Sequence, residues 1–140
     1  MKTPHFFSMT LLLTTAMAQA QTSRVAVGTT TPRAGLDVAH DDGFVATGTP
    51  NQGNTDNLPT GAGPRLMWIP AKAAFRVGAA TDNKWDIDNV GDLSVSLGGG
   101  TMASGASAVA LGFGTTASGT FATAAGYNTT ASGTNSTALG

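Results

Sequence analysis

Charged and reactive side chains are scarce in this chain of 140 residues. It contains no cysteine and no glutamate, and only two histidines. Without cysteine it has no disulfide and no thiol, which fits an envelope protein that needs neither. Residues 93–140 carry no charge at all, so this segment offers no acid or base for catalysis. We therefore expect a protein that is not an enzyme.

The charges that do occur also restrict the possible partners. Removal of a leader over residues 1–20, described below, leaves six Lys and Arg against eight Asp, a formal net charge of about −2. Nucleic acid and anionic lipid are bound by basic stripes or patches, and the sequence has none. We expect no nucleic-acid partner.

In place of charge, the C-terminal part of the chain has a repeat. "ASG" begins at Ala103, Ala117 and Ala131, and "ALG" or "AAG" begins seven residues after each, so both markers recur every fourteen residues. A degenerate copy, "NVGDLSVSLGGGTM", occupies residues 89–102. Units this short bury their apolar side chains only by stacking on neighbouring units. Four stacked units are therefore predicted, the last of them cut short.

The composition of each unit favours strands, because glycine, serine and threonine are poor helix formers. In "SAVALG", Val109 and Leu111 alternate with Ala108 and Ala110, which is the period of a strand. We expect Val109 and Leu111 to fill the interior and the two alanines to face another chain. Two strands of about five residues and two short turns fit one unit, which predicts a narrow β-solenoid.

"ASGASAVALG", followed by "ASGTFATAAG" and "ASGTNSTALG", resembles the head repeat of YadA-like trimeric autotransporter adhesins over residues 89–140. The resemblance implies a left-handed parallel β-roll, a homotrimer packed around an axis, and a surface that binds host matrix proteins or other cells. The family's serine three residues after the "ASG" glycine is matched by Ser94 and Ser136. Ala108 and Ala122 replace it in the other two units.

The N-terminus has the pattern of a secretory signal peptide over residues 1–20. Lys2 precedes an apolar run at residues 6–17, and "AQA" at residues 18–20 fits an A-x-A cleavage site. The run is too short to span a bilayer, and no other segment is a candidate transmembrane helix. With the resemblance, this predicts secretion and a place on the surface or outer membrane of a Gram-negative bacterium.

The stalk and β-barrel anchor of that family do not follow the repeats. We therefore expect a fragment, a truncated reading frame, or a protein that borrows its anchor.

Residues 21–88 predict a separate, small β-rich module, so that the whole chain is all-β. Two short alternating stretches lie at residues 25–27 and 36–38. "RLMWIPAKAAFRVG" predicts a hairpin with strands near residues 65–69 and 73–77. Because residues 66–69 are continuously apolar, we expect both faces of that strand to be covered, and a second chain could provide one cover.

Candidate metal sites are few, and each has a structural alternative. "DIDNVGD" at residues 86–92 places aspartates at the first and third positions of a calcium loop, but Val90 and Leu97 stand where ligands are needed. A solvated junction is favoured there. His40, beside two aspartates, favours an exposed turn over a metal ligand or base. We expect no catalytic residue, cofactor or metal.

Two tryptophans and two asparagines complete the set of candidates. Trp68 and Trp85 are possible binding platforms, although burial in a small core or a chain interface is favoured. Sequons begin at Asn128 and Asn135, and with an adhesin-like repeat we expect them to be unmodified.

Three functions remain open: adhesion, ice or crystal-surface binding, and a structural fibre without a ligand. Adhesion is favoured, through rows of hydroxyl and amide side chains that bind a partner with many weak contacts. Ice binding is suggested by two threonine columns, Thr101, Thr115 and Thr129 beside Thr116 and Thr130. However, adjacent threonines in a strand point to opposite faces, whereas ice-binding solenoids generally use T-x-T.

The leader makes a direct prediction, cleavage after Ala20, because the A-x-A pattern ends there. The mass of the secreted protein measures it. A secreted chain that still begins at Met1 would contradict the assignment.

Overall fold

The computed structural model describes residues 25–27, 30, 34, 36–38, 44–53 and 55–140. The predicted signal peptide at residues 1–20 and His40 lie outside these residues, so both stay predictions. The chain forms two compact units, residues 1–45 and 46–140, which are described separately. The predicted boundary between residues 88 and 89 falls inside a 3-10 helix, Ile87–Asn89, and separate folding of the two modules stays a prediction.

The first unit contains two short strands that pair in parallel. β1 (Val25–Val27) lies beside β2 (Leu36–Val38), with Val25 opposite Leu36. The two alternating stretches of the sequence are thus confirmed as strands. Leu36 and Val38 are exposed within the chain.

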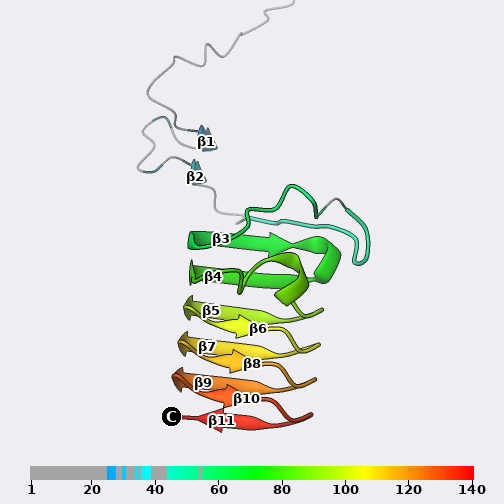
Figure 1. Cartoon of the computed structure of the whole chain (residues 1–140). Coiled ribbons are helices and arrows are strands. Elements are labelled where there is room, and N and C mark those ends of the chain that lie inside the picture. The colour runs from blue at the N-terminus through cyan, green and yellow to red at the C-terminus, as the bar shows by residue number, and fades with distance from the viewer. Residues whose placement is uncertain (1–24, 28–29, 31–33, 35, 39–43, 54) are drawn as a thin grey trace, which may run out of the picture. The chain divides into compact units, whose positions relative to one another are not determined.

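The second unit consists of two sheets stacked as the layers of a solenoid (Figure 1). One is a six-stranded sheet in the order β11-β9-β7-β5-β4-β3, and the other a three-stranded sheet in the order β10-β8-β6. The six strands are β3 (Gly63–Ile69), β4 (Ala74–Ala80), β5 (Val95–Gly99), β7 (Val109–Phe113), β9 (Thr123–Tyr127) and β11 (Thr137–Leu139). The three are β6 (Met102–Ala103), β8 (Thr116–Ala117) and β10 (Thr130–Ala131).

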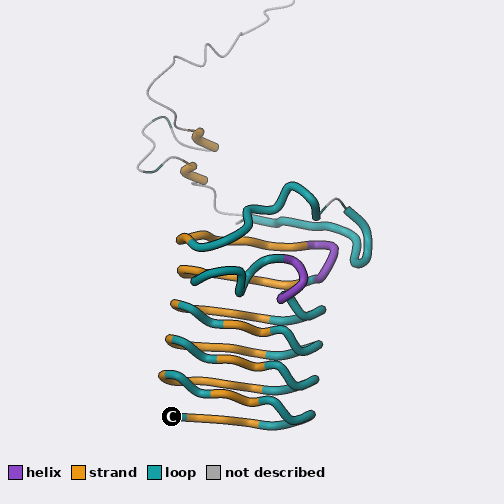
Figure 2. Tube along the Cα trace, in the orientation of Figure 1, coloured by secondary structure: helices purple, strands orange, loops and turns teal. Residues whose placement is uncertain are grey.

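Each coil gives one long strand to the first sheet and one short strand to the second (Figure 2). Val95, Val109, Thr123 and Thr137 face one another in successive parallel strands, a step of fourteen residues. The prediction of an all-β solenoid is therefore confirmed, with about three turns. The expectation of two five-residue strands per coil is wrong, because β6, β8 and β10 have two residues each.

The turns use the remaining residues of each coil. Gly112 has φ 108° and Gly114 φ 67° at one end of the coil, and Ser107 has φ 54° at the other. Gly112 and Gly114 adopt these left-handed conformations without strain, whereas Ser107 is a non-glycine residue with a positive φ. A second long strand would leave too few residues for both turns.

The interior of the coils is lined by alanine. Ala108 and Ala110 are fully buried, whereas Val109 and Leu111 are half-buried on the outside of the sheet. The predicted orientation of these two pairs is wrong. The coils are also stacked very closely, since a Cβ added to Gly105 would lie 2.0 Å from the carbonyl oxygen of Gly119. The fully buried side chains of the second and third coils are alanine and threonine, and the larger apolar side chains, such as Val109 and Leu111, lie outside.

Small hydroxyls share this interior with the alanines. Ser96 Oγ donates a hydrogen bond of 2.7 Å to Thr101 Oγ1, and both side chains are buried. In the next coil Ala110 takes the place of Ser96 in the ladder, and the buried Oγ1 of Thr115 has no hydrogen-bond partner. The row that contains Ser94 also lies inside, because Ser94 and Ala108 are both buried.

The predicted hairpin is confirmed and continues the six-stranded sheet. β3 and β4 pair antiparallel around the 3-10 helix η1 (Pro70–Lys72), and β4 pairs in parallel with β5. A wider core lies beneath it, formed by Met67, Ile69, Ala74, Ala80, Trp85 and Val90. The indole Nε1 of Trp85 donates a 2.7 Å hydrogen bond to the carbonyl of Thr101, so the favoured burial of Trp85 is confirmed.

The hydrogen bond between Ser96 and Thr101 in the first coil suggests a stabilising substitution at the equivalent position of the second coil. Ala110→Ser places a hydroxyl where Ser96 has one, and we expect it to satisfy Thr115 Oγ1 and raise the free energy of unfolding by about 1 kcal/mol. Ala110→Val, which adds bulk but no hydroxyl, should lower it by about 1–3 kcal/mol. Thermal or denaturant unfolding at one protein concentration compares them. Equal destabilisation by both variants would contradict this description of the interior.

Candidate interaction surfaces

The outer side of the six-stranded sheet carries two ladders of mostly apolar side chains, which together we call the apolar face. Residues of each ladder lie directly opposite one another in neighbouring strands. The first ladder is Leu66, Val77, Leu97, Leu111, Ala125 and Leu139. The second is Trp68, Phe75, Val95, Val109, Thr123 and Thr137.

Much of the apolar face is uncovered within the chain. Leu66 is 71% exposed, Trp68 39% and Leu139 74%. None of the twelve residues is charged. Of the two faces of the strand at residues 66–69 that were expected to be covered, the one with Met67 and Ile69 is buried within the chain. Cover of the other face by a second chain stays a prediction. A contiguous exposed apolar surface of this kind marks a contact site for another molecule.

An aromatic pair lies at the end of the long strands. The rings of Phe113 and Tyr127 are stacked with centroids 5.7 Å apart, and both residues are more than half exposed. Gly99 precedes them in the ladder, and a Cβ there would lie 2.8 Å from the Phe113 ring. The glycine therefore lets the first ring lie flat on the preceding coil.

The other sheet presents a polar surface, which we call the hydroxyl face. It is formed by Thr116 and Thr130, in register on β8 and β10, and by the serines that follow these strands and β6, Ser104, Ser118 and Ser132. On β6 the same register position holds the apolar Met102. The two sheets lie on opposite sides of the coils (Figure 1). Because Ala110 on one sheet and Ala117 on the other are both buried between them, the alternating hydroxyl and apolar faces lie on opposite outer sides.

The threonine columns are placed on opposite sides, as adjacent strand residues require. Thr101 and Thr115 are buried inside the coils, and the Oγ1 of Thr129 is buried too. Thr116 and Thr130 remain at the surface. The double column that suggested ice binding is therefore a single exposed column.

The aspartates of the possible calcium loop have separate roles. Asp86 Oδ1 accepts a 2.8 Å hydrogen bond from the amide of Gly61, and Asp92 forms a 3.1 Å ion pair with Lys72 Nζ. Among the described residues, no three His, Cys, Asp or Glu side chains are grouped so that they could hold a metal. Asn128 and Asn135, which begin the sequons, are exposed.

A buried cation, Arg76, was not singled out by the sequence. Its guanidinium lies inside the first coil and donates to the carbonyls of Phe75, Ser94 and Ala103 and to Ser94 Oγ, at 2.7–3.0 Å. Burial lowers the pKa of Arg76 to about 10. The arginine connects β4 to β6 across the coil, and we assign it a role in stabilising the fold. Its only signal in the sequence is its place between Phe75 and Val77, in a strand of alternating pattern.

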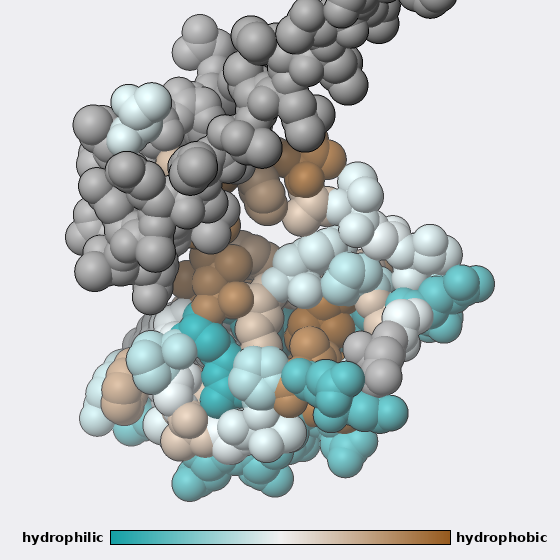
Figure 3. All heavy atoms as spheres, turned by 90° about the horizontal axis from the view of Figure 1, so that it is seen from above, coloured by the Kyte–Doolittle hydropathy of each residue, from teal (hydrophilic) through white to brown (hydrophobic). Residues whose placement is uncertain are grey.

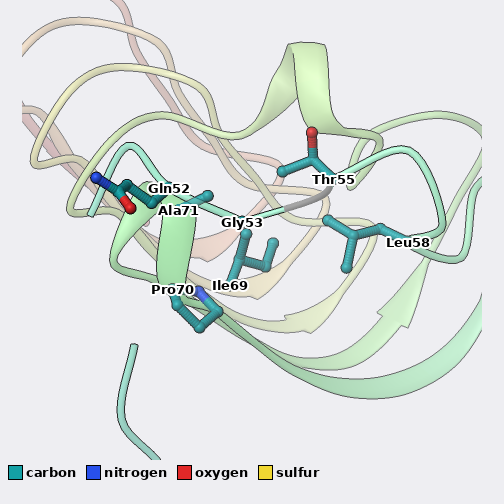
Figure 4. Close-up of a pocket in the computed structure, with 7 residues that line it drawn as sticks. All are labelled: Gln52, Gly53, Thr55, Leu58, Ile69, Pro70 and Ala71. Atoms are coloured by element: carbon teal, nitrogen blue, oxygen red, sulfur yellow. The ribbon is translucent and has the colours of Figure 1, made fainter. Parts of the chain in front are cut away.

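The hairpin end also has a small pocket of about 180 Å³. It lies between η1 and the preceding loop, and no charged side chain lines it (Figure 4). The lining residues are Gln52, Gly53, Thr55, Leu58, Ile69, Pro70 and Ala71. Viewed from this end, apolar atoms reach the surface beside polar ones (Figure 3). Within the described residues, no helix has the length and apolarity to cross a membrane.

The comparison with protein families matches the solenoid. The model of the YadA head domain repeat fits twice, to residues 90–115 and 117–140. Neither the search of curated proteins nor that of solved structures gave a match. The two copies cover the coils whose alanine interior and apolar outer ladders are described above. Residues 90–115 and 117–140 of the solenoid thus match the YadA head domain repeat.

Proposed function

We propose that this chain is a head segment of a surface adhesin and acts as a homotrimer, without catalysis. The observation that carries the proposal is the apolar face, an uncharged surface that the chain leaves open in a fold of the YadA head repeat family. We further propose that the protein is exported by its N-terminal leader and displayed on the surface of a Gram-negative cell.

The thin coil supports association. Its interior contains alanine, serine and threonine, so one chain buries little apolar area on folding. At about 25 cal/mol per Å², this area does not offset the entropy of ordering a glycine-rich chain. Packing of Val109, Leu111 and their neighbours against other chains adds the missing burial. These residues, not Ala108 and Ala110, make the contacts between chains.

The hydroxyl face supports adhesion. It points away from the apolar face, so three packed chains would display three copies to the outside. A row of serine and threonine hydroxyls suits an extended partner with repeated polar groups, such as a matrix protein or a cell-surface polymer. Individually weak contacts then add up through multivalency. A structural fibre is the alternative with the same fold, and only a binding measurement separates the two.

The two kinds of face should respond differently to a new charge. Leu111→Asp puts a carboxylate into each chain's apolar face, and we expect trimer formation to weaken by at least about tenfold, because desolvating an unpaired charge costs several kcal/mol. Thr116→Asp, on the hydroxyl face, should leave assembly unchanged. Analytical ultracentrifugation measures both. Equal effects would mean that the apolar face is not the interface.

Adhesion itself is tested by binding of the mature chain to immobilised matrix proteins. The double variant Thr116→Ala, Thr130→Ala should bind about tenfold more weakly, since a loss repeated on three chains multiplies. Its matched control is Thr120→Ala with Thr134→Ala, which lie in exposed turns outside the hydroxyl face. If a trimer binds none of the matrix proteins, the protein is a structural fibre.

A further inference from the structure

The apolar side chains of the apolar face are not evenly distributed along the solenoid. In the second ladder, the hairpin contributes Trp68 and Phe75, the next two strands contribute valine, and the last two contribute threonine. The first ladder does not follow this gradient, because it has leucine at both ends, Leu66 and Leu139. The two aromatic side chains of the apolar face, Trp68 and Phe75, both lie at the hairpin end.

The hairpin presents these groups from a fixed position. Met67 and Ile69 alternate with Leu66 and Trp68 on β3 and are buried in the core that contains Trp85. β3 is paired with β4 over its whole length, from Gly63 opposite Ala80 to Ile69 opposite Ala74. Leu66 and Trp68 are thus held on the outer side, although they are exposed.

The positive charges of the hairpin are held away from this surface. Arg65 donates to the carbonyl oxygens of Pro59 and Gly61. Arg76 is buried inside the coil, and Lys72 is paired with Asp92. The hairpin's part of the apolar face is therefore as free of charge as the coils, so identical copies can meet there without electrostatic repulsion.

We propose that the β3–β4 hairpin forms the strongest part of the contact between chains, with Trp68 and Leu66 packed against the hairpins of the other copies. This inference rests on the proposed homotrimer and extends it, because the residues matched by the family model begin at Val90 and leave the hairpin out. The occupant is a second copy of this chain, since both ladders run without a break from the hairpin into the coils.

The test compares both ends of one ladder in the full mature chain. Trp68→Ala and Thr137→Ala each truncate one residue of the second ladder, at the hairpin and at the last strand. Sedimentation equilibrium should show that Trp68→Ala raises the concentration of half-dissociation at least about tenfold and Thr137→Ala less than about twofold. Circular dichroism at high concentration verifies that both variants fold.

Fluorescence provides a readout that does not depend on a disruptive variant. Trp68→Phe keeps an apolar ring, and the difference between its emission and that of the wild type isolates Trp68 from the buried Trp85. Acrylamide should quench the Trp68 signal in dilute protein, and the signal should become protected at the concentrations where the trimer forms.

Three outcomes overturn the inference in distinguishable ways. A trimer in which Trp68 stays accessible to acrylamide refutes the role of the hairpin and leaves the proposed homotrimer standing. Trp68 protected in a monomer means that the same chain covers it, which refutes the contact between hairpins. A folded monomer at every concentration refutes the homotrimer and the hairpin contact together.

Discussion

The thinness of the coil is the constraint on which the rest of the structure depends. Fourteen residues supply two strands and two turns, and the coils are stacked so closely that a methyl group on Gly105 would overlap the carbonyl of Gly119. Fully buried side chains of the repeats are small, as at Ala110, Ser96 and Thr115, and the larger buried Arg76 reaches only the first coil, from β4. Close packing of such small groups fills the interior without a conventional apolar core.

Two surfaces of opposite character follow from this constraint. Leucine and valine, excluded from the interior, line the outside of the six-stranded sheet, while hydroxyls line the other sheet. Within the described residues the wider core lies under the hairpin, where Arg76 joins β4 to β6 and Trp85 bonds to the carbonyl of Thr101. The charged residues belong to this end of the unit, so the coils are left neutral and suited to close contact with identical chains.

Much of this architecture was predictable from the sequence because it depends on spacing. The fourteen-residue register, the strands and the hairpin around Pro70 follow from repeats and alternation. The side of each strand that faces inward does not, because alternation separates Val109 from Ala110 without saying which one is inside. That choice depends on the volume enclosed by the coil, a property of the stacked backbone.

For the candidate surfaces too, the sequence predicts which residues alternate but not which side of the strand faces the interior. Burial of Trp85 was expected because tryptophan is large and apolar. Trp68 is exposed because it lies on the outer side of the six-stranded sheet, a position that its residue type does not indicate. Thr115 and Thr116 were expected on opposite sides, yet only the coil shows that Thr115 is the inner one. The burial of Arg76 could not be predicted from a sequence motif. Its hydrogen-bond acceptors are the carbonyls of Ser94 and Ala103 and the hydroxyl of Ser94, which are distant in the sequence.

The central claim is that a coil this thin stays folded only when its apolar face is covered by other copies. Hydrogen exchange at the amides of Ala110 and Ala124, followed over a dilution series of the mature chain, tests it most directly. These amides lie within the long strands of the second and third coils, so their protection reports on the solenoid itself. We predict that protection is high in concentrated protein and is lost on dilution as chains separate. Protection that is independent of protein concentration would contradict the claim.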